Sequence, residues 1–296
     1  MGTNSASPQT RRVNVNGISL AYYDWPGERG PLICIPSITG HKGTFTAVAE
    51  RLSPQYRVLS LDLRGRCDSD KPGDGYGFAY HTRDIVAFAE AVKVGNFVLV
   101  GHSFGATTSV YLASIHPTRV SALVLMDGGA DPKADTLMAM YSTIKRLTKI
   151  YTTMDEYLAA QRAIAYHHPW TPALERYLRE DMQTLEDGSV QSKSSASAIG
   201  LDLDMHFQEN VWFHLPFLKC PVLFLRPQQG LLGTTGHVYS ESESSKLVQQ
   251  IPHCRYENVA GGNHYTFLLQ DDPPVVPYIQ KFLDHVFASS VAQQGS

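Results

Sequence analysis

The sequence predicts an α/β protein in which helices cover both faces of a mostly parallel β-sheet. Short apolar runs bounded by turn residues alternate with stretches whose apolar residues recur at spacings of three and four. Such alternation is typical of a parallel sheet covered on both faces. It stops between about residues 131 and 215, which contain no convincing strand. We expect a helical cap there, inserted between two strands.

The elements follow in a regular order. Residues 13–20 alternate around Asn16-Gly17, which is a strong hairpin signal. The expected buried strands are 32–35, 58–61, 97–100, 122–126, 222–225 and 256–259. The expected helices are 44–52, 80–92, 104–115, 242–251 and 275–287. These elements place the α/β core at residues 11–130 and 216–290 and the cap at 131–215.

Helix starts are also visible inside the cap. Thr153 with Glu156 can form a capping box, in which the side chain of each residue accepts the backbone N–H of the other. Thr171 precedes Pro172, which suits the first helical position because proline lacks an N–H. Both signals favour helices in this interval.

Composition excludes several classes of partner. A chain of 296 residues with 43% hydrophobic residues can form one large core, and a net charge of −3 favours neither nucleic acid nor a membrane surface. No apolar run approaches the ~20 residues of a membrane span. Residues 1–10 are polar, lack the apolar segment of a secretory signal and are expected to form a flexible arm. The scattered cysteines predict reduced thiols in a cytoplasmic protein, without a disulfide or zinc site: Cys34, Cys67, Cys220 and Cys254.

The chemistry is indicated by the sequence GHSFG, residues 101–105. It follows an expected strand and opens an expected helix, which is the context of a nucleophile elbow. Glycines flank the serine because the turn is tight and leaves no room for side chains. The hydroxyl of Ser103 would project beside a helix N-terminus, where backbone N–H groups stabilise negative charge.

These motifs together resemble the α/β-hydrolase family along nearly the whole chain. Residues 62–72, DLRGRCDSDKP, are similar to its D-x-R-G-x-G-x-S-x-x-P stretch, with Cys67 where the family usually has glycine. The turn AGGNHY at 260–265 is similar to the family's G-x-x-H, and LKCP at 218–221 is similar to a common lead-in to the penultimate strand. The resemblance implies an eight-stranded sheet and serine hydrolase chemistry without metal or cofactor. A serine at the elbow excludes the dehalogenase and epoxide-hydrolase branches, which need aspartate there.

The resemblance also assigns roles to individual residues. His264, in the Gly-rich turn after the last strand, is implied as the general base that takes the Ser103 proton. The oxyanion hole is implied at the backbone N–H groups of Phe104 and Ile38. The family's usual His-Gly is replaced here by Pro36-Ser37, so the register leaves Ser37 as an alternative to Ile38.

The catalytic acid is missing from its usual place. The family usually carries it after the penultimate strand, but no Asp or Glu occurs from 226 to 240. Asp127, at the end of the strand beside the nucleophile's strand, is our candidate. Glu241 and Glu243 are expected to be first-turn residues of a helix. A surrogate from elsewhere, or a Ser–His dyad, stays open, although Asn263 is a poor surrogate because its side chain competes with its own turn.

We expect the substrate to be a small to medium, largely apolar carboxylic ester. Amide, lactone, thioester or carbon–carbon bond hydrolysis of a small metabolite is the alternative, and a non-catalytic ligand receptor or scaffold is an alternative of another class. The oligomeric state stays open, including a homo-oligomer. Aromatic cap residues could line an apolar pocket or form the core of the cap itself: Tyr141, Tyr151, Trp170, Phe207, Trp212 and Phe213.

Overall fold

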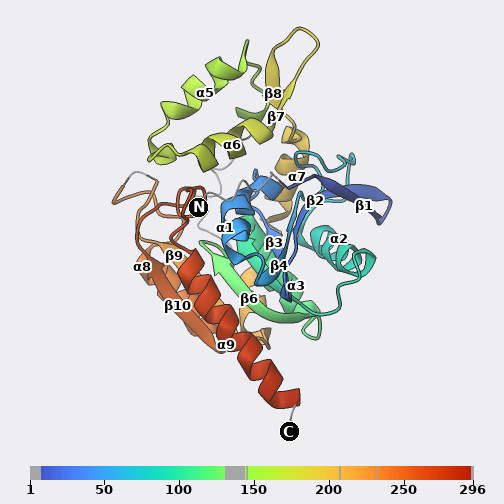
Figure 1. The fold of residues 1–296 in the computed structure, drawn as a ribbon, viewed down its shortest axis with the longest axis vertical. Helices are drawn as coiled ribbons and strands as arrows, with labels where there is room; N and C mark the ends of the chain where they lie inside the picture. Colours follow the sequence, from blue (N-terminus) through green and yellow to red (C-terminus); the bar gives the residue numbers. More distant parts are fainter. Residues whose placement is uncertain (1–7, 131–143, 145, 207, 232, 295–296) are drawn as a thin grey trace.

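A single eight-stranded sheet forms the centre of the molecule (Figure 1). The computed structural model describes residues 8–130, 144, 146–206, 208–231 and 233–294. The strand order is β1-β2-β4-β3-β5-β6-β9-β10, and the strands from β4 to β10 in this order pair in parallel. Their bounds are β1 Arg11–Val15, β2 Ile18–Trp25, β3 Arg29–Ile35, β4 Tyr56–Leu61, β5 Phe97–His102, β6 Val120–Met126, β9 Val222–Pro227 and β10 Cys254–Val259.

Every strand expected from the sequence is present. β1 and β2 pair antiparallel with Val15 opposite Ile18, so the Asn16-Gly17 turn closes a two-residue hairpin. Asn16 and Gly17 have φ of 47° and 79°, the left-handed values that this kind of turn requires. The predicted eight-stranded and mostly parallel sheet is thus confirmed.

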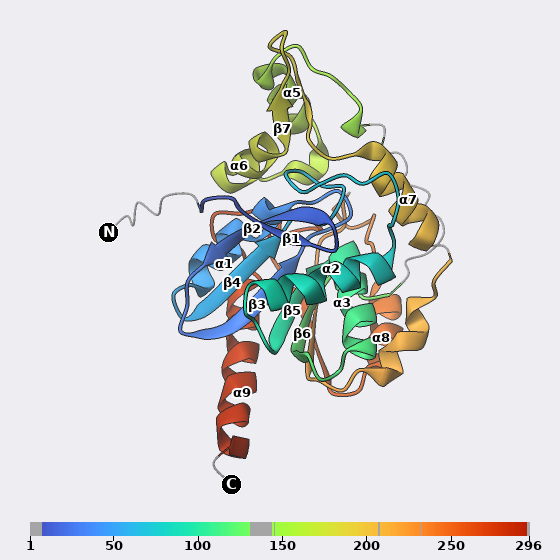
Figure 2. The same ribbon diagram turned by 90° about the vertical axis from the view of Figure 1, so that its right-hand side faces the viewer.

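Helices cover both faces of the sheet (Figure 2). Alternate residues of β5 enter two separate cores: Leu99 belongs to the core that also contains residues of α2, α3 and α8, whereas Val98 and Val100 belong to the core that contains residues of α1 and α9. Burial on both faces explains why this strand is a continuous apolar run. The bounds are η1 Lys42–Phe45, α1 Thr46–Leu52, α2 Phe78–Ala91, α3 Phe104–Ile115, α8 Glu241–Gln250 and α9 Val276–Gln294.

The cap lies at the end of the sheet where the parallel strands finish (Figures 1 and 2). Thr153 caps α5 by accepting the N–H of Glu156, and Thr171 caps α6 with Pro172 in its first turn, as the sequence predicts. The carboxylate of Glu156 reaches the N–H of Thr152, not that of the cap residue itself. The described cap elements are α5 Met154–Arg162, η2 Ala165–His167, α6 Pro172–Glu180, β7 Met182–Thr184, β8 Val190–Ser192, α7 Ala196–His206 and η3 Val211–Phe217.

One expectation about the cap was wrong: it contains a short antiparallel hairpin, β7–β8, and not only helices. Each strand has three residues, which is too short for an alternating pattern to stand out. The signal that could have revealed it is Asp187-Gly188 in the connecting turn, because this dipeptide is typical of hairpin turns.

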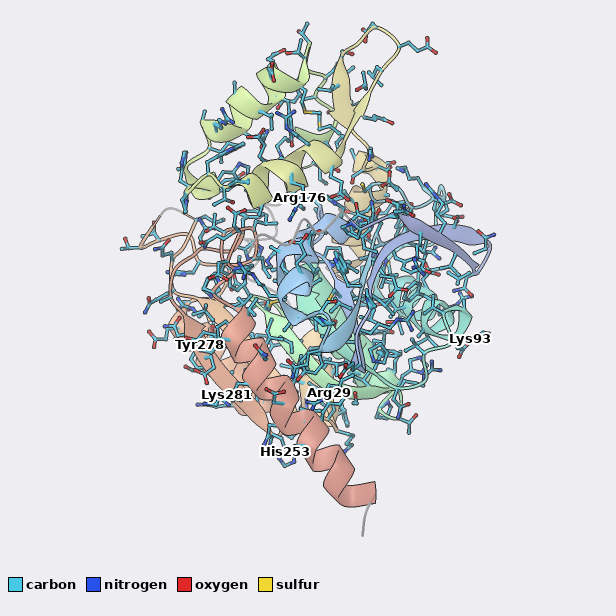
Figure 3. The ribbon with its side chains drawn as sticks, viewed as in Figure 1. Arg29, Lys93, Arg176, His253, Tyr278 and Lys281 are labelled. Carbon is cyan, nitrogen blue, oxygen red and sulfur yellow. The ribbon has the colours of Figure 1, made fainter. Side chains whose placement is uncertain are left out.

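Ion pairs that range from fully buried to exposed join the cap to the core. Asp202 of α7 pairs with Arg66, and both side chains are fully buried. Glu180, the last residue of α6, lies 3.4 Å from the ammonium of Lys42. Arg176 of α6, labelled where the cap meets α1 in Figure 3, lies 3.6 Å from the carboxylate of Glu50.

The four cysteines have no disulfide partner, and three of them are buried. Among the described residues, no helix is long and apolar enough to cross a membrane. The expected flexible arm falls largely on residues 1–7, which lie outside the described residues.

Candidate active site

The turn between β5 and α3 holds Ser103 in a strained conformation. Its φ of 55° and ψ of −120° lie in a region that residues with a Cβ rarely adopt. The Ser103 N–H donates to the Met126 carbonyl at 2.9 Å, and its carbonyl accepts the N–H of Ala106 at 2.9 Å. Ser103 is 9% exposed and immediately precedes α3, so the helix N-terminus can stabilise negative charge formed there.

The loop after β3 packs directly against this turn. A Cβ on Gly105 would lie 2.1 Å from the carbonyl oxygen of Ile35 and 2.5 Å from that of Pro36, so only glycine permits this approach. The contact brings the start of α3 to the loop that contains Ile38. Ile38 and Phe104 are both 4% exposed and belong to the same apolar core. The carbonyl of Ile38 accepts a hydrogen bond from Arg66 Nε at 3.1 Å, which orients this loop.

His264 and Asp127 lie side by side at the same edge of the sheet. His264 Nδ1 is 2.6 Å from Asp127 Oδ2, and both side chains are buried. Asp127 follows β6 with a φ of 45°, and its N–H donates to the Leu225 carbonyl at 2.8 Å. The carboxylate can therefore fix the tautomer of His264 and stabilise its protonated form.

The Nδ1 contact leaves Nε2 of His264 to act on a hydroxyl. Within the described part of the chain, the Ser103 hydroxyl makes no hydrogen bond. Such bonds are often long before substrate binds and shorten only in the reacting complex. Gly128 packs against the backbone of Ser103, since a Cβ there would lie 2.3 Å from the Ser103 carbonyl oxygen. The turn that carries Asp127 thus touches the turn that carries Ser103.

His102 supports the main chain of His264. Its Nε2 lies 2.9 Å from the His264 carbonyl oxygen, and the two ring centroids are 4.5 Å apart. Burial, together with the nearby His264, holds the pKa of His102 well below its usual value. The ring is therefore neutral and donates its Nε2 proton to that carbonyl.

The other carboxylates and the amide considered for the acid have different partners. Glu243 lies in the first turn of α8, as the sequence predicts, and it also accepts the N–H of Ser240 at 2.8 Å to complete a capping box. Glu241 is exposed in the first turn of the same helix. Asn263 Oδ1 accepts the backbone N–H groups of Tyr265 and Thr266, each at 3.0 Å. None of these bonds leads to His264.

A cavity of about 40 Å³ lies between the cap and the core. Thr39 and Tyr265 line it from the core, and they follow Ile38 and His264 directly in the chain. Leu269 adds a third core residue. The cap supplies the rest of the lining: Arg146, Leu147, Tyr151, Tyr157, Gln161, His167, Tyr177, Leu178, Asp181, Met182 and Ser192.

Only part of this lining was expected. Among the candidate cap aromatics, Tyr151 lines the cavity, whereas Phe213 is 72% exposed. Trp170 and Trp212 are half-buried outside the lining. Two further candidates lie outside the described residues: Tyr141 and Phe207.

Sequence reasoning did not single out Arg146 or the tyrosines Tyr157, Tyr177 and Tyr265. They come from separate segments, so no local motif marks them. The position of Tyr265 directly after His264 is the one signal that could have pointed to the site.

A family profile described as the alpha/beta hydrolase fold matches residues 30–271. The chain belongs to the α/β-hydrolase family. This α/β hydrolase is 25% identical to a 2-(acetamidomethylene)succinate hydrolase of Mesorhizobium japonicum, over 86% of this chain and 88% of the relative. It is 37% identical to an N-formylmaleamate deformylase of Pseudomonas putida, over 39% of this chain and 43% of that protein. The crystal structure of an E-2-(acetamidomethylene)succinate hydrolase has the same fold, with a TM-score of 0.81, 23% identity, and coverage of 94% of this chain and 99% of the other.

The α/β hydrolase has one group of potential metal ligands among its described residues, formed by His41, Asp62 and Cys67. A cation already belongs to this group, because Lys42 Nζ lies 3.1 Å from Asp62 Oδ2 and 3.9 Å from Cys67 Sγ. Burial raises the pKa of the Cys67 thiol, so the thiolate that a metal needs is disfavoured. The cluster suits the lysine ammonium better than a metal ion.

Proposed function

We propose that this α/β hydrolase cleaves an acyl bond of a small metabolite by two-step acyl transfer. Ser103 is the nucleophile, His264 the general base and Asp127 the acid that orients it. The observation that carries the proposal is the 2.6 Å contact between His264 Nδ1 and Asp127 Oδ2 at the sheet edge where the turn of Ser103 also lies.

In the first step, Ser103 Oγ attacks the substrate carbonyl carbon while His264 Nε2 accepts the hydroxyl proton. The carbonyl oxygen becomes an oxyanion, and the backbone N–H groups of Phe104 and Ile38 stabilise it. The position of Phe104 at the start of α3 supports this role, since N–H groups point outward there. When the tetrahedral intermediate collapses, the bond to the leaving alcohol or amine breaks, and His264 gives that group its proton.

In the second step, water attacks the acyl-enzyme. His264 takes one proton from the water and returns it to Ser103 Oγ as the ester bond to the serine breaks. The product is a carboxylic acid. Each donor of the oxyanion hole is expected to contribute roughly 10²–10³ in rate.

The bond cleaved is an ester or an amide. The proposed Ser103 mechanism suits both bonds, because each reacts through a tetrahedral intermediate of the same kind and the two differ only in the leaving group. A carboxylic ester is what the sequence predicts. The names of the two relatives, an acetamidomethylene-succinate hydrolase and an N-formylmaleamate deformylase, favour an amide as the second candidate.

Covalent labelling tests the proposal. A fluorophosphonate probe should label the wild-type protein and should not label Ser103→Ala. A panel of ester and amide pairs with the same acyl group then separates the two bond classes, since an amide cleaved within tenfold of its ester marks an amidase. A wild-type protein that is neither labelled nor active on any member of the panel would instead support a non-catalytic receptor or scaffold.

A further inference from the structure

Arg146 places a positive charge in the wall of the cap cavity. Its guanidinium has five donors and is always charged in proteins. The hydrogen bond found for it joins Nη1 to the hydroxyl of Tyr166 at 3.1 Å. Among the described residues, no carboxylate lies within 4.0 Å of this guanidinium. The side chain therefore lines the cavity with most of its donors unused.

Tyrosine hydroxyls add further donors to the same cavity. Tyr157, Tyr177 and Tyr265 all belong to the lining, and their hydroxyls have no hydrogen-bond partner in the described part of the chain. Burial raises the pKa of each, so all three remain protonated donors. Apart from the hydroxyl of Tyr166, no acceptor in the described part of the chain is hydrogen-bonded to this guanidinium, and a negatively charged acceptor complements it best.

The other titratable lining groups do not supply this acceptor. The two oxygens of Asp181 accept hydrogen bonds from Ser192 Oγ at 2.8 Å and Ser194 Oγ at 3.2 Å. Burial lowers the pKa of His167 to about 4, so His167 is neutral at pH 7, and its Nδ1 lies 3.1 Å from the Gln161 carbonyl oxygen. Among the described lining residues, Arg146 is therefore the charged group whose hydrogen-bond donors mostly lack an acceptor.

The size and position of the cavity indicate what it can hold. A volume of about 40 Å³ has room for about three non-hydrogen atoms, judged by the 10–15 Å³ that one water needs. That is the size of one carboxylate group and not of a whole metabolite. Thr39 and Tyr265 line the cavity and directly follow Ile38 and His264 in the chain. A group held there can belong to a molecule whose acyl carbon lies at Ser103.

We propose that Arg146 binds a carboxylate of the substrate in this cavity, so that the enzyme prefers acyl compounds that carry a second, anionic carboxylate. The guanidinium pairs with the carboxylate, and the tyrosine hydroxyls donate to its remaining lone pairs. This inference rests on the proposed acyl transfer at Ser103 and names the substrate class of that site.

Two chromogenic esters of equal shape test it. 4-Nitrophenyl hemisuccinate ends in a carboxylate, whereas 4-nitrophenyl levulinate ends in a neutral acetyl group of similar size. The wild-type enzyme should favour the hemisuccinate in kcat/KM, with Ser103→Ala giving the uncatalysed background. Arg146→Gln should lower kcat/KM for the hemisuccinate by roughly 30-fold or more, mainly through KM, as expected for a charged hydrogen bond. The loss on the levulinate should be at least tenfold smaller.

The control variant is Lys149→Gln, which removes an exposed positive charge three residues further along the chain, outside the lining. It should preserve the preference for the hemisuccinate. Equal losses on both esters in Arg146→Gln, or a wild-type enzyme without the preference, would overturn the carboxylate site. Fluorophosphonate labelling of Ser103 separates that outcome from a failure of the proposed function, because labelling then persists while selectivity is absent.

Discussion

The carboxylate of Asp127 lies 2.6 Å from Nδ1 of His264, although the two residues are 137 positions apart in the chain. Asp127 follows β6 and His264 follows β10, and β9 is the strand between them in the sheet. A carboxylate after β9 would have been the usual arrangement in this family. The loop after β9 has no Asp or Glu from 228 to 240, and the proposed acid, Asp127, lies one strand closer to Ser103.

Asp127→Asn should therefore lower kcat by roughly 10²–10⁴-fold with a smaller effect on KM, because the amide no longer holds the tautomer of His264 or stabilises its charge. Steady-state kinetics on one ester, with thermal unfolding to verify the fold, measure this. Glu241→Gln is the matched control, since it also neutralises one carboxylate, and it should retain nearly full activity. An Asp127→Asn protein that is folded and almost as active as wild type would assign the acid to another residue.

Two different signals in the sequence predicted this pair: His264 lies in a turn that resembles the family's G-x-x-H, and Asp127 ends the strand beside the nucleophile's strand. The boundaries of α3 were also predictable, since Ser103 fixes the turn and the helix starts at the next residue. Local patterns of this kind determine the sheet, the elbow and the order of the candidate catalytic residues. Each of these patterns depends on residues that are close in the chain or that lie at the common edge of the sheet.

The cap was less predictable for a physical reason. Arg146 gains its position only when the cap folds over the core, and nothing in its neighbouring sequence distinguishes it from a solvated surface arginine. The same applies to Lys42, whose ammonium is enclosed by Asp62 and Asp68 from a distant segment. A charged side chain is buried only where tertiary partners compensate its charge. No periodic pattern in a single sequence reveals those partners.

Gly128 should be essential for the rate. A Cβ at this position would lie 2.3 Å from the Ser103 carbonyl oxygen and 2.7 Å from its Cα, so Gly128→Ala must move the nucleophile's turn. A displacement of about 1 Å at a reacting group can reduce the rate by about 10²-fold. We expect a loss of that size in kcat and a loss of about 1–3 kcal/mol in the free energy of unfolding.

Gly95→Ala is the control for Gly128→Ala, because a Cβ at Gly95 would meet no atom within 4 Å. This variant should keep both the rate and the stability of the wild-type enzyme. If Gly128→Ala retains the wild-type kcat, the contact between the two turns does not position Ser103.

The buried pair between Arg66 and Asp202 should be a major attachment of the cap. Asp202 also accepts the N–H of Gly77 at 2.6 Å and lies 2.9 Å from Nε2 of His81. Asp202→Asn would leave the guanidinium of Arg66 buried without its counter-charge. We expect the free energy of unfolding to fall by about 3–5 kcal/mol, as measured by chemical denaturation.

A surface pair provides the comparison for Asp202→Asn. Glu90 lies 3.0 Å from Arg119, and its side chain is 63% exposed. Glu90→Gln removes the same kind of charge in a solvated setting and should cost less than about 1 kcal/mol. Equal effects of the two variants would show that burial adds nothing to the cap pair.

Stability should depend on pH through His102 and His167. Burial and the nearby His264 hold the pKa of His102 well below its usual value, and burial lowers the pKa of His167 to about 4. Below about pH 6.5 the unfolded chain binds protons at these residues that the folded protein does not bind. Above that pH the two histidines are unprotonated in both the folded and the unfolded state, so they do not make the stability depend on pH. As the pH falls from 6.5 toward 4, each histidine lowers the free energy of unfolding by up to about 1.4 kcal/mol per pH unit.

His102→Gln and His167→Gln should each make this decline shallower, because glutamine can donate to the same carbonyl without taking up a proton. The readout is the slope of the free energy of unfolding against pH, which separates proton uptake from any constant loss of packing. His168→Gln is the matched control, since that ring is exposed to solvent in the folded protein, and it should leave the slope nearly unchanged. Unchanged slopes in both buried variants would mean that other groups, and not these two histidines, control the loss of stability in acid.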